Sequence, residues 1–166
     1  MFKIKVVAVG KVKEKYFLDA ILEYKKRLSR FCDISICEVK EENFTKEPNL
    51  SEISEILKRE GESILKELKG YVVAMAIEGK KCSSEGLAKL IKNQVDKGQE
   101  ITFVIGGSYG ICDEVKTSAD MLLSFSDATF PHTLFRVMLL EQVYRAFSIN
   151  ADARYHKWQK NICALL

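Results

Sequence analysis

Residues 150–158 combine the side chains of this chain that are best suited to acid–base chemistry and to contacts with nucleic acid. Arg154 can donate two parallel hydrogen bonds to a phosphate, and Tyr155 and His156 can stack on unpaired bases. Histidine exchanges a proton near neutral pH, which makes His156 a candidate proton acceptor. A frayed terminus is the alternative interpretation, because such a terminus can have the same composition.

Residues 106–110, Gly-Gly-Ser-Tyr-Gly, follow an apolar run typical of a buried strand and precede a short helix. Glycines let the backbone approach a ligand closely. The segment is neither the GxGxxG nucleotide fingerprint nor a phosphate-binding P-loop. Asp113 and Glu114, in the first turn of the following helix, would repel a phosphate. The loop is therefore predicted to suit a neutral or cationic ligand, with a plain tight turn as the alternative.

The five cysteines are odd in number and form no CxxC pair, which argues against a disulfide framework and against a structural zinc site. The two histidines, His132 and His156, are too few for a dedicated transition-metal site. We therefore expect reduced thiols that pack as small apolar residues, and no metal.

The length of 166 residues corresponds to one domain, since domains usually contain roughly 100–200 residues. Apolar residues make up 47% of the chain, which is enough for a core and excludes general disorder. The longest run without a charge, 101–112, has twelve residues, whereas a membrane-spanning helix needs about 20. Lys3 and Lys5 interrupt the apolar N-terminus, so no signal peptide is expected and a cytoplasmic location is predicted.

The net charge of +3 conceals an uneven distribution. Residues 1–30 contain nine basic and three acidic side chains, residues 31–131 contain twelve and eighteen, and residues 132–166 contain five and two. If the two basic ends meet in the fold, they form a face suited to phosphates. Lysines that are merely solvated on helix surfaces are the alternative.

Apolar periodicity predicts strands that alternate with helices, a pattern typical of an α/β domain with a largely parallel sheet. Unbroken apolar runs at 71–77 and 101–105 indicate strands that are buried on both faces. Ser51 is the expected cap of the second helix, and Ser83 or Ser84 that of the third. The predicted strands are 2–9, 34–39, 71–77, 101–105 and 121–126, and the predicted helices are 16–28, 51–68, about 84–97, a short one after residue 110, and 132–149.

The last predicted helix, 132–149, is apolar around nearly its whole circumference. Such a helix either lies centrally in the core or is shared with a partner subunit, and the small size of the domain favours the partner. Glu141 and Arg145 are spaced for an ion pair along this helix.

Four runs of residues, in order along the chain, resemble one known family. They are 103–110 (Phe-Val-Ile-Gly-Gly-Ser-Tyr-Gly), 129–132 (Thr-Phe-Pro-His), 141–147 (Glu-Gln-Val-Tyr-Arg-Ala-Phe) and 155–156 (Tyr-His). The sequence is similar to the ribosomal RNA large subunit methyltransferase H family, which belongs to the SPOUT class of knotted methyltransferases. The resemblance extends from the strand near residue 10 to His156, essentially the whole chain, and four motifs at fitting spacing are specific.

The resemblance implies a single SPOUT domain at 1–156, with 157–166 as a C-terminal extension beyond the family pattern. It implies an α/β fold with a mostly parallel sheet, helices on both faces and a C-terminal trefoil knot. A homodimer and the cofactor S-adenosylmethionine (SAM), which leaves as S-adenosylhomocysteine, are also implied. Carried over position by position, the cofactor-binding residues are Met75, Gly107, Ser126, Asp127, Ala128, Thr129, Phe130 and Pro131.

The implied reaction is methylation of N3 of a pseudouridine in 23S rRNA within the assembled ribosome. N3–H must lose its proton, and His156 is the candidate acceptor, with Tyr155 orienting it or stacking on the base. Arg145 and Arg154 would stabilise anionic oxygens of the base or grip a phosphate. His132, directly after the proposed cofactor loop, is a candidate orienting residue. No metal is needed for the transfer of an activated methyl group.

Two other classes compete with the methyltransferase hypothesis. One is a non-catalytic ribosome-binding or RNA-binding module with the same fold. The other is a flavodoxin-like nucleotide or flavin protein, which the missing phosphate-binding loop and the acidic pair Asp113 and Glu114 disfavour.

Overall fold

The computed structural model describes residues 1–42 and 47–151. In this part, the strands form one sheet in the order β2-β1-β4-β3-β5, and all neighbouring pairs are parallel. The predicted α/β class with a parallel sheet is therefore confirmed. The strands are β1 (Phe2–Val9), β2 (Cys32–Val39), β3 (Tyr71–Lys81), β4 (Ile101–Ile105) and β5 (Met121–Ser124), and the helices are α1 (Lys15–Leu28), α2 (Leu50–Leu65), α3 (Ser84–Asp96), α4 (Asp113–Ser118) and α5 (His132–Asn150).

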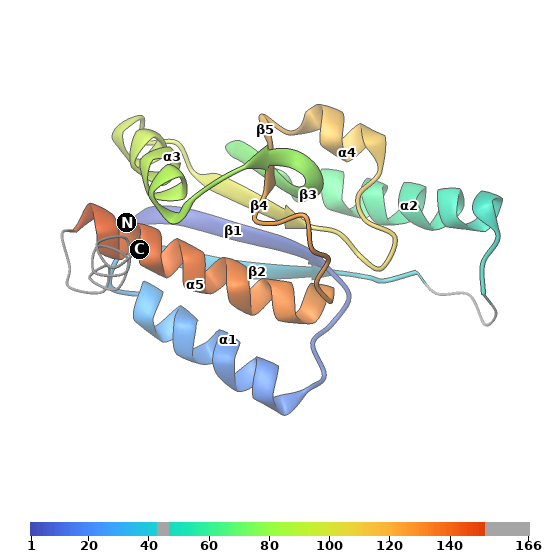
Figure 1. Cartoon of the computed structure of the whole chain (residues 1–166), viewed down its shortest axis with the longest axis horizontal. Helices are drawn as coiled ribbons and strands as arrows, with labels where there is room; N and C mark the ends of the chain where they lie inside the picture. Colours follow the sequence, from blue (N-terminus) through green and yellow to red (C-terminus); the bar gives the residue numbers. More distant parts are fainter. Residues whose placement is uncertain (43–46, 152–166) are drawn as a thin grey trace, which may run out of the picture.

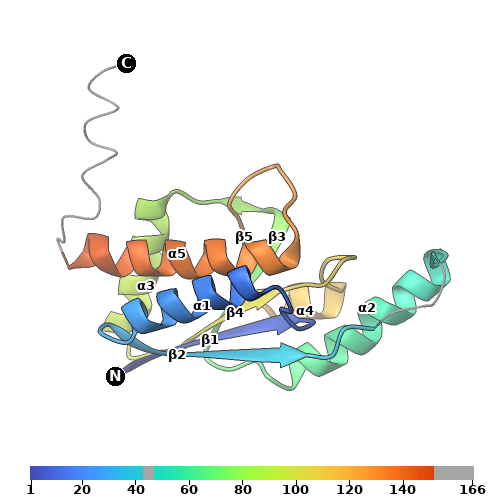
Figure 2. The ribbon, with the colours of Figure 1, turned by 90° about the horizontal axis from the view of Figure 1, so that it is seen from below.

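Helices cover both faces of the sheet, as Figures 1 and 2 show, with α1, α3 and α5 on one side and α2 and α4 on the other. The alternation along β1 explains the two cores, because successive side chains of a strand point to opposite faces. Ile4, Val6 and Ala8 belong to the core under α1, α3 and α5, whereas Val7 and Val9 belong to the core under α2 and α4. The trefoil knot that the resemblance implies stays a prediction.

Two helix starts illustrate local control by capping residues. Ser83 caps α3 by accepting a hydrogen bond from the Gly86 N–H at 3.1 Å, as predicted. The prediction of Ser51 as the cap of α2 is wrong. Asn49 takes that role: its side chain accepts from the Glu52 N–H at 3.0 Å, and the Glu52 carboxylate accepts from the Asn49 N–H at 2.8 Å. This reciprocal capping box satisfies two backbone donors at once, which a single serine two residues later would not do.

The strand β3 is longer than predicted, because it continues past an irregularity. Its register against β5 shifts between Met75 and Lys80, so the backbone bends away where the apolar run ends. Gly79 lies in this bend, and a Cβ there would come within 2.6 Å of the Leu123 nitrogen. Residues 75–78, at the start of this irregularity, line the cavity described below.

The cysteines that the structure describes are free thiols, and Cys32 is 1% exposed in the core. Burial raises the pKa of the Cys32 thiol to about 12, so it stays protonated and packs as a small apolar group. None of the described helices combines the length and the apolar composition that a membrane crossing requires.

The helix α5 lies between α1 and α3 on its face of the sheet, so it has a central place in this core (Figure 1). That a partner subunit also packs on α5 stays a prediction. Val137 and Met138 are half-buried, so part of their apolar surface is accessible to such a partner. The side chains that α5 contributes to the core are Leu139, Leu140, Val143, Ala146 and Phe147.

Arg136, near the start of α5, is 1% exposed although it is charged. Its Nη2 donates to the carbonyl oxygens of Val9 at 2.6 Å and Gly10 at 2.8 Å, and its Nη1 donates to Glu38 Oε1 at 2.8 Å. Burial lowers the pKa of Arg136, and the Glu38 carboxylate counteracts that shift. One guanidinium thus fastens α5 to the carboxyl ends of β1 and β2.

Replacing Arg136 with methionine is expected to lower the free energy of unfolding by about 2–4 kcal/mol, because buried carbonyl oxygens lose their charged donor. Urea denaturation followed by circular dichroism measures this loss. Glu38→Gln is the comparison variant and should cost less, because the Glu38 side chain is 32% exposed. Equal unfolding midpoints for Arg136→Met and the wild type would contradict the assignment.

Candidate functional site

A cavity of about 730 Å³ lies beyond the carboxyl ends of β3, β4 and β5. Ligands of open parallel sheets bind at such an edge, because the loops that leave neighbouring strands meet there. The volume is within the range of about 300–1,000 Å³ that is usual for small-molecule sites. Its walls come from residues 75–78 at the irregularity within β3, from 105–111 at and after the end of β4, from 123–132 at and after the end of β5 except Asp127, and from Lys116 and Phe135.

Seven of the eight residues expected to bind a cofactor line this cavity. Three segments far apart in the sequence are thus brought together at one edge of the sheet. Asp127 is the exception, because its carboxylate forms an ion pair with Lys81 on the outside of the loop. The seven residues are Met75, Gly107, Ser126, Ala128, Thr129, Phe130 and Pro131.

The glycine segment 106–110 is a tight turn whose backbone lines the cavity, so the two interpretations offered by the sequence are compatible. The Gly110 N–H donates to the Gly107 carbonyl at 3.1 Å, and Gly110 has a φ of 89° that side chains disfavour. A Cβ on Gly106 would lie 2.3 Å from the Gly110 carbonyl oxygen. Only glycine allows the chain to fold back so closely at this position.

The loop 126–131 is shaped by local serine hydrogen bonds. The Ser124 hydroxyl donates to the Ser126 carbonyl at 2.9 Å, and the Ser126 hydroxyl accepts from the Ala128 N–H at 2.9 Å. Beside this loop, the ring centroid of Phe135 lies 5.4 Å from that of Phe125 and 6.5 Å from that of Phe130. The loop therefore presents an aromatic wall to the cavity.

The cavity contains little positive charge. Lys116 is the one Lys or Arg among its lining residues, and its Nζ lies 2.6 Å from Glu78 Oε1. The Lys116 ammonium holds the pKa of Glu78 below its usual value, which favours the charged carboxylate. A phosphate would find no free cation on these walls, and the arrangement suits a neutral or cationic ligand, as the sequence predicted.

The helix α2 supports the glycine turn from behind through Glu60 and Gly61, two residues that the sequence analysis missed. Glu60 is 3% exposed, and its Oε1 accepts from the Glu42 N–H at 3.0 Å. A Cβ on Gly107 would lie 3.0 Å from Glu60 Oε2, and a Cβ on Gly61 would lie 2.3 Å from Cys112 Sγ. These approaches fix both ends of the segment 107–112.

The sequence did carry a signal for the burial of Glu60. Ile56 and Ile64 lie four residues before and after it, and positions four apart share one helix face. Both isoleucines are buried, so their face of α2 must pack on the sheet. Burial raises the pKa of Glu60, and the nearby carboxylates of Glu41 and Glu42 act in the same direction.

The predicted catalytic residues are not all placed by the structure. Arg154, Tyr155 and His156, like the extension 157–166, lie outside the described residues. Arg145 is described and does not line the cavity. It pairs with Glu141, with its Nε 3.0 Å and its Nη2 2.5 Å from Glu141 Oε1, as the spacing predicted. His132 lines the cavity at the start of α5.

The two ends of the chain were expected to form one basic face, but the described part of the C-terminal end adds no exposed basic side chain to it. Arg136 is buried and Arg145 is paired, so neither adds to an open basic surface. Among the described residues of these two segments, the exposed basic side chains are Lys3 of β1 and those of α1 and the short segments on either side of it. The predicted contribution of the C-terminal end rests on residues outside the described range.

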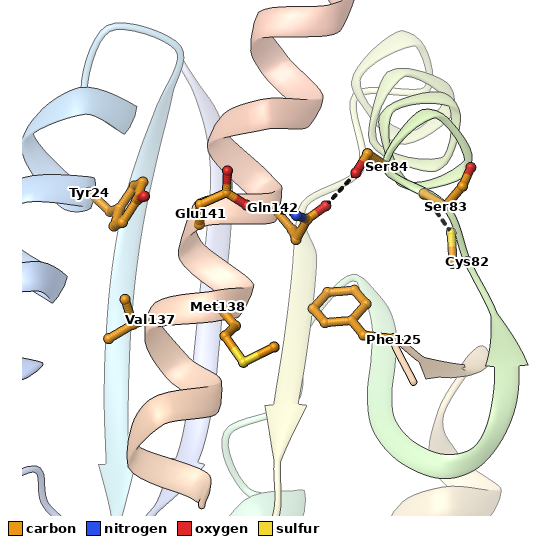
Figure 3. A pocket seen from close by; sticks show the side chains of 9 residues that line it. All are labelled: Tyr24, Cys82, Ser83, Ser84, Phe125, Val137, Met138, Glu141 and Gln142. Carbon is orange, nitrogen blue, oxygen red and sulfur yellow. Dashed lines mark hydrogen bonds between the residues drawn. The ribbon is translucent and has the colours of Figure 1, made fainter. Parts of the chain in front are cut away.

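A second cavity, of about 530 Å³, lies between α1, the start of α3 and α5 (Figure 3). Ser84 donates to Gln142 Oε1 at 2.7 Å, and Gln142 Nε2 donates to Glu141 Oε2 at 2.7 Å. Val137, Met138 and Phe125 supply apolar walls, and Phe125 also borders the first cavity. Within residues 1–42 and 47–151, no group of three or more His, Cys, Asp or Glu side chains is arranged to hold a metal ion.

Comparison with known proteins gives a consistent result. The family model described as "Predicted SPOUT methyltransferase" matches residues 2–156. The chain is 50% identical over 156 residues to the ribosomal RNA large subunit methyltransferase H of Caldicellulosiruptor saccharolyticus, covering 93% of this chain and 99% of that protein. It is 51% identical over 157 residues to the protein of the same name from Lactobacillus helveticus, with the same coverage.

A solved structure shares the fold. The "putative methylase family protein" from Neisseria gonorrhoeae superposes with a TM-score of 0.51, covering 85% of this chain and 81% of that chain. The sequence identity of 9% limits this likeness to the fold.

Replacing Glu60 with glutamine should raise the melting temperature at neutral and alkaline pH. A buried carboxylate is costly when charged, and Glu60 forms no ion pair with the residues that the structure describes. Since folding raises the pKa of Glu60, that cost is complete above the raised pKa and disappears below the pKa of the unfolded chain. Melting curves from pH 4 to pH 8 should therefore converge at the acidic end. Glu62→Gln, at an exposed position of α2, is the control. A difference that is constant with pH would contradict the argument.

Proposed function

The chain belongs to the SPOUT methyltransferase family, and from that premise we propose that it transfers a methyl group from SAM to a nucleotide of large-subunit ribosomal RNA. The observation that carries the proposal is the cavity at the sheet edge, because the segments carried over from the family meet around it. The relatives at about 50% identity supply the ribosomal RNA by their names. Position N3 of a pseudouridine in 23S rRNA rests on the resemblance of the motifs.

The residues around the cavity fit the cofactor. When bound, SAM supplies a methyl carbon that is already activated by a positively charged sulfonium. The apolar and aromatic walls suit its adenosine and its aliphatic part, and the paired state of Lys116 leaves no free cation to repel the sulfonium. Met75, the backbone of residues 106–107 and the loop 126–131 are the parts of the chain that would hold it.

The remaining chemistry is the removal of a proton from the acceptor nitrogen. We assign this role to His156, with Tyr155 orienting its ring or stacking on the target base. Arg154 would stabilise negative charge on the base or grip a phosphate. Arg145 pairs with Glu141 away from the cavity, so the same role for it would require a contact from the substrate at that pair. General base catalysis of this kind contributes about 10²–10⁴-fold.

The length of α5 bears on which pocket His156 serves. From Phe135 at the cavity to Asn150 the helix rises about 22 Å. The six residues from Asn150 to His156 span at most about 22 Å when fully extended. His156 would therefore reach the cavity of its own chain only if this segment ran straight back along α5. A second copy of the chain removes that constraint, which supports a homodimer in which each His156 serves the partner's cavity.

Labelled methyl transfer tests the proposed function. Purified protein with labelled SAM should label 23S rRNA in ribosomes that lack the modification. His156→Ala should reduce the turnover number by about 100-fold or more while the Kd for SAM, measured by calorimetry, changes little. Saturable SAM binding without any labelled rRNA would favour the non-catalytic binding module, and no saturable binding would overturn the methyltransferase proposal.

The dimer is tested by complementation between two inactive chains. Gly106→Val should block the cavity turn, because even a Cβ there meets the Gly110 backbone, and His156→Ala removes the proton acceptor. Mixed in equal amounts after unfolding and refolding, the two should recover about a quarter of wild-type activity, from mixed dimers with one intact site. Sedimentation should show dimers at micromolar concentration for each chain. No recovery from confirmed mixed dimers would place His156 at its own chain's cavity.

A further inference from the structure

Three lysines occupy alternate positions in the segment that joins β1 to α1. Lys11, Lys13 and Lys15 are all exposed, and Tyr16, the next residue, is 67% exposed. None of the three lysines forms an ion pair with another residue of the described chain. They are therefore available to a partner with negative charge.

The core holds the base of this segment in place. Val12 is 7% exposed, and its N–H donates to Glu38 Oε1 at 3.3 Å, so the lysines on either side of it are directed outward. The Gly10 N–H donates to the Val39 carbonyl at 2.9 Å, and Arg136 binds the Gly10 carbonyl. The lysines thus extend from an anchored backbone, which reduces the entropy lost on binding.

The segment begins beside the cavity that lies at the sheet edge. A Cβ on Gly10 would lie 3.4 Å from Nε2 of His132, which lines that cavity. Carboxylates close to the segment are those of Glu14, Glu38 and Glu41. Glu38 is engaged by Arg136 and Val12, and Glu41 Oε1 accepts from the Ser108 hydroxyl at 3.3 Å. The Glu14 carboxylate accepts from the backbone N–H of Lys13 at 3.3 Å. Three lysines beside this one carboxylate of the segment leave it positive.

We propose that Lys11, Lys13 and Lys15 bind phosphates of the RNA strand that carries the target base, with Tyr16 stacking on a neighbouring base. The inference rests on the proposed function and names the part of the chain that receives the substrate's backbone. Cations that follow one another along an exposed segment, together with an aromatic side chain, match the chemistry of unpaired RNA. The cavity itself offers phosphates no free cation, so this positive segment supplies what its walls lack.

The test compares two triple variants. Lys11→Ala, Lys13→Ala and Lys15→Ala are combined in one chain. Lys66→Ala, Lys69→Ala and Lys97→Ala are combined in the control, which loses the same charge from exposed positions at the opposite, amino edge of the sheet. For each chain, filter binding measures the Kd for large ribosomal subunits that lack the modification, at several salt concentrations. Calorimetry measures the Kd for SAM, and labelled transfer gives kcat/KM.

The first triple variant should bind the ribosomal subunits about tenfold or more weakly at 100 mM salt, with a slope of log K against log salt shallower by about two. Its kcat/KM should fall in parallel, and its Kd for SAM should stay within about twofold. The control should resemble the wild type. Tyr16→Ala should weaken binding without changing the salt slope, because stacking releases no counterions.

Ribosome binding by the first triple variant equal to that of the control would overturn the proposal. A change from dimer to monomer in sedimentation would also overturn it, because the segment would then belong to a contact between copies of the chain. Failure of the wild type to transfer methyl groups would refute the proposed function alone. The binding measurements decide the role of the three lysines independently of transfer.

Discussion

The buried guanidinium of Arg136 is the interaction on which the geometry of this molecule depends. It joins the start of α5 to the carboxyl ends of β1 and β2 through two carbonyl oxygens and the Glu38 carboxylate. A charged group at 1% exposure is tolerated only because these acceptors replace water. Because the loop 126–131 leads directly into α5, a fixed start of α5 also fixes the end of this loop, which is one wall of the cavity. The same guanidinium holds Gly10, from which the lysine segment begins.

The opposite wall is fixed from the other side of the sheet. Glu60 and Gly61 of α2 pack against Gly107 and Cys112, so the glycine turn is held between the sheet edge and a helix that does not itself line the cavity. The close approach at Gly61 and the folded-back turn at Gly106 both require the absence of a side chain. The cavity is thereby preformed by packing, which lowers the cost of ordering its walls around a ligand.

The sequence predicted the features that follow from the spacing of apolar residues and from the family motifs. The apolar runs predicted the strands, and Ser83 was one of two predicted caps of α3. The family motifs predicted the segments that the structure brings together around one cavity. Features that depend on three-dimensional context were missed. Arg136 looked like an interruption of an apolar helix, and its burial depends on carbonyl oxygens contributed by a strand more than 120 residues earlier. Glu60 could have been recognised from its place between Ile56 and Ile64, but its contact with Gly107 could not.

The proposed function requires one small domain to serve two ligands of opposite charge. A sulfonium cation favours walls without free positive charge, whereas RNA favours exposed lysines, and the two requirements conflict if they fall on the same surface. Here Lys116 is neutralised by Glu78 inside the cavity, while the unpaired lysines lie outside it on the segment after β1. The parallel sheet makes this separation possible, because the irregular part of β3 and the loops after β4 and β5 build the cavity, and the segment after β1 begins beside it. Under the proposed function, the two neighbouring loop regions at this edge of the sheet would bind the two ligands separately, the cofactor in the cavity and the RNA on the lysines after β1.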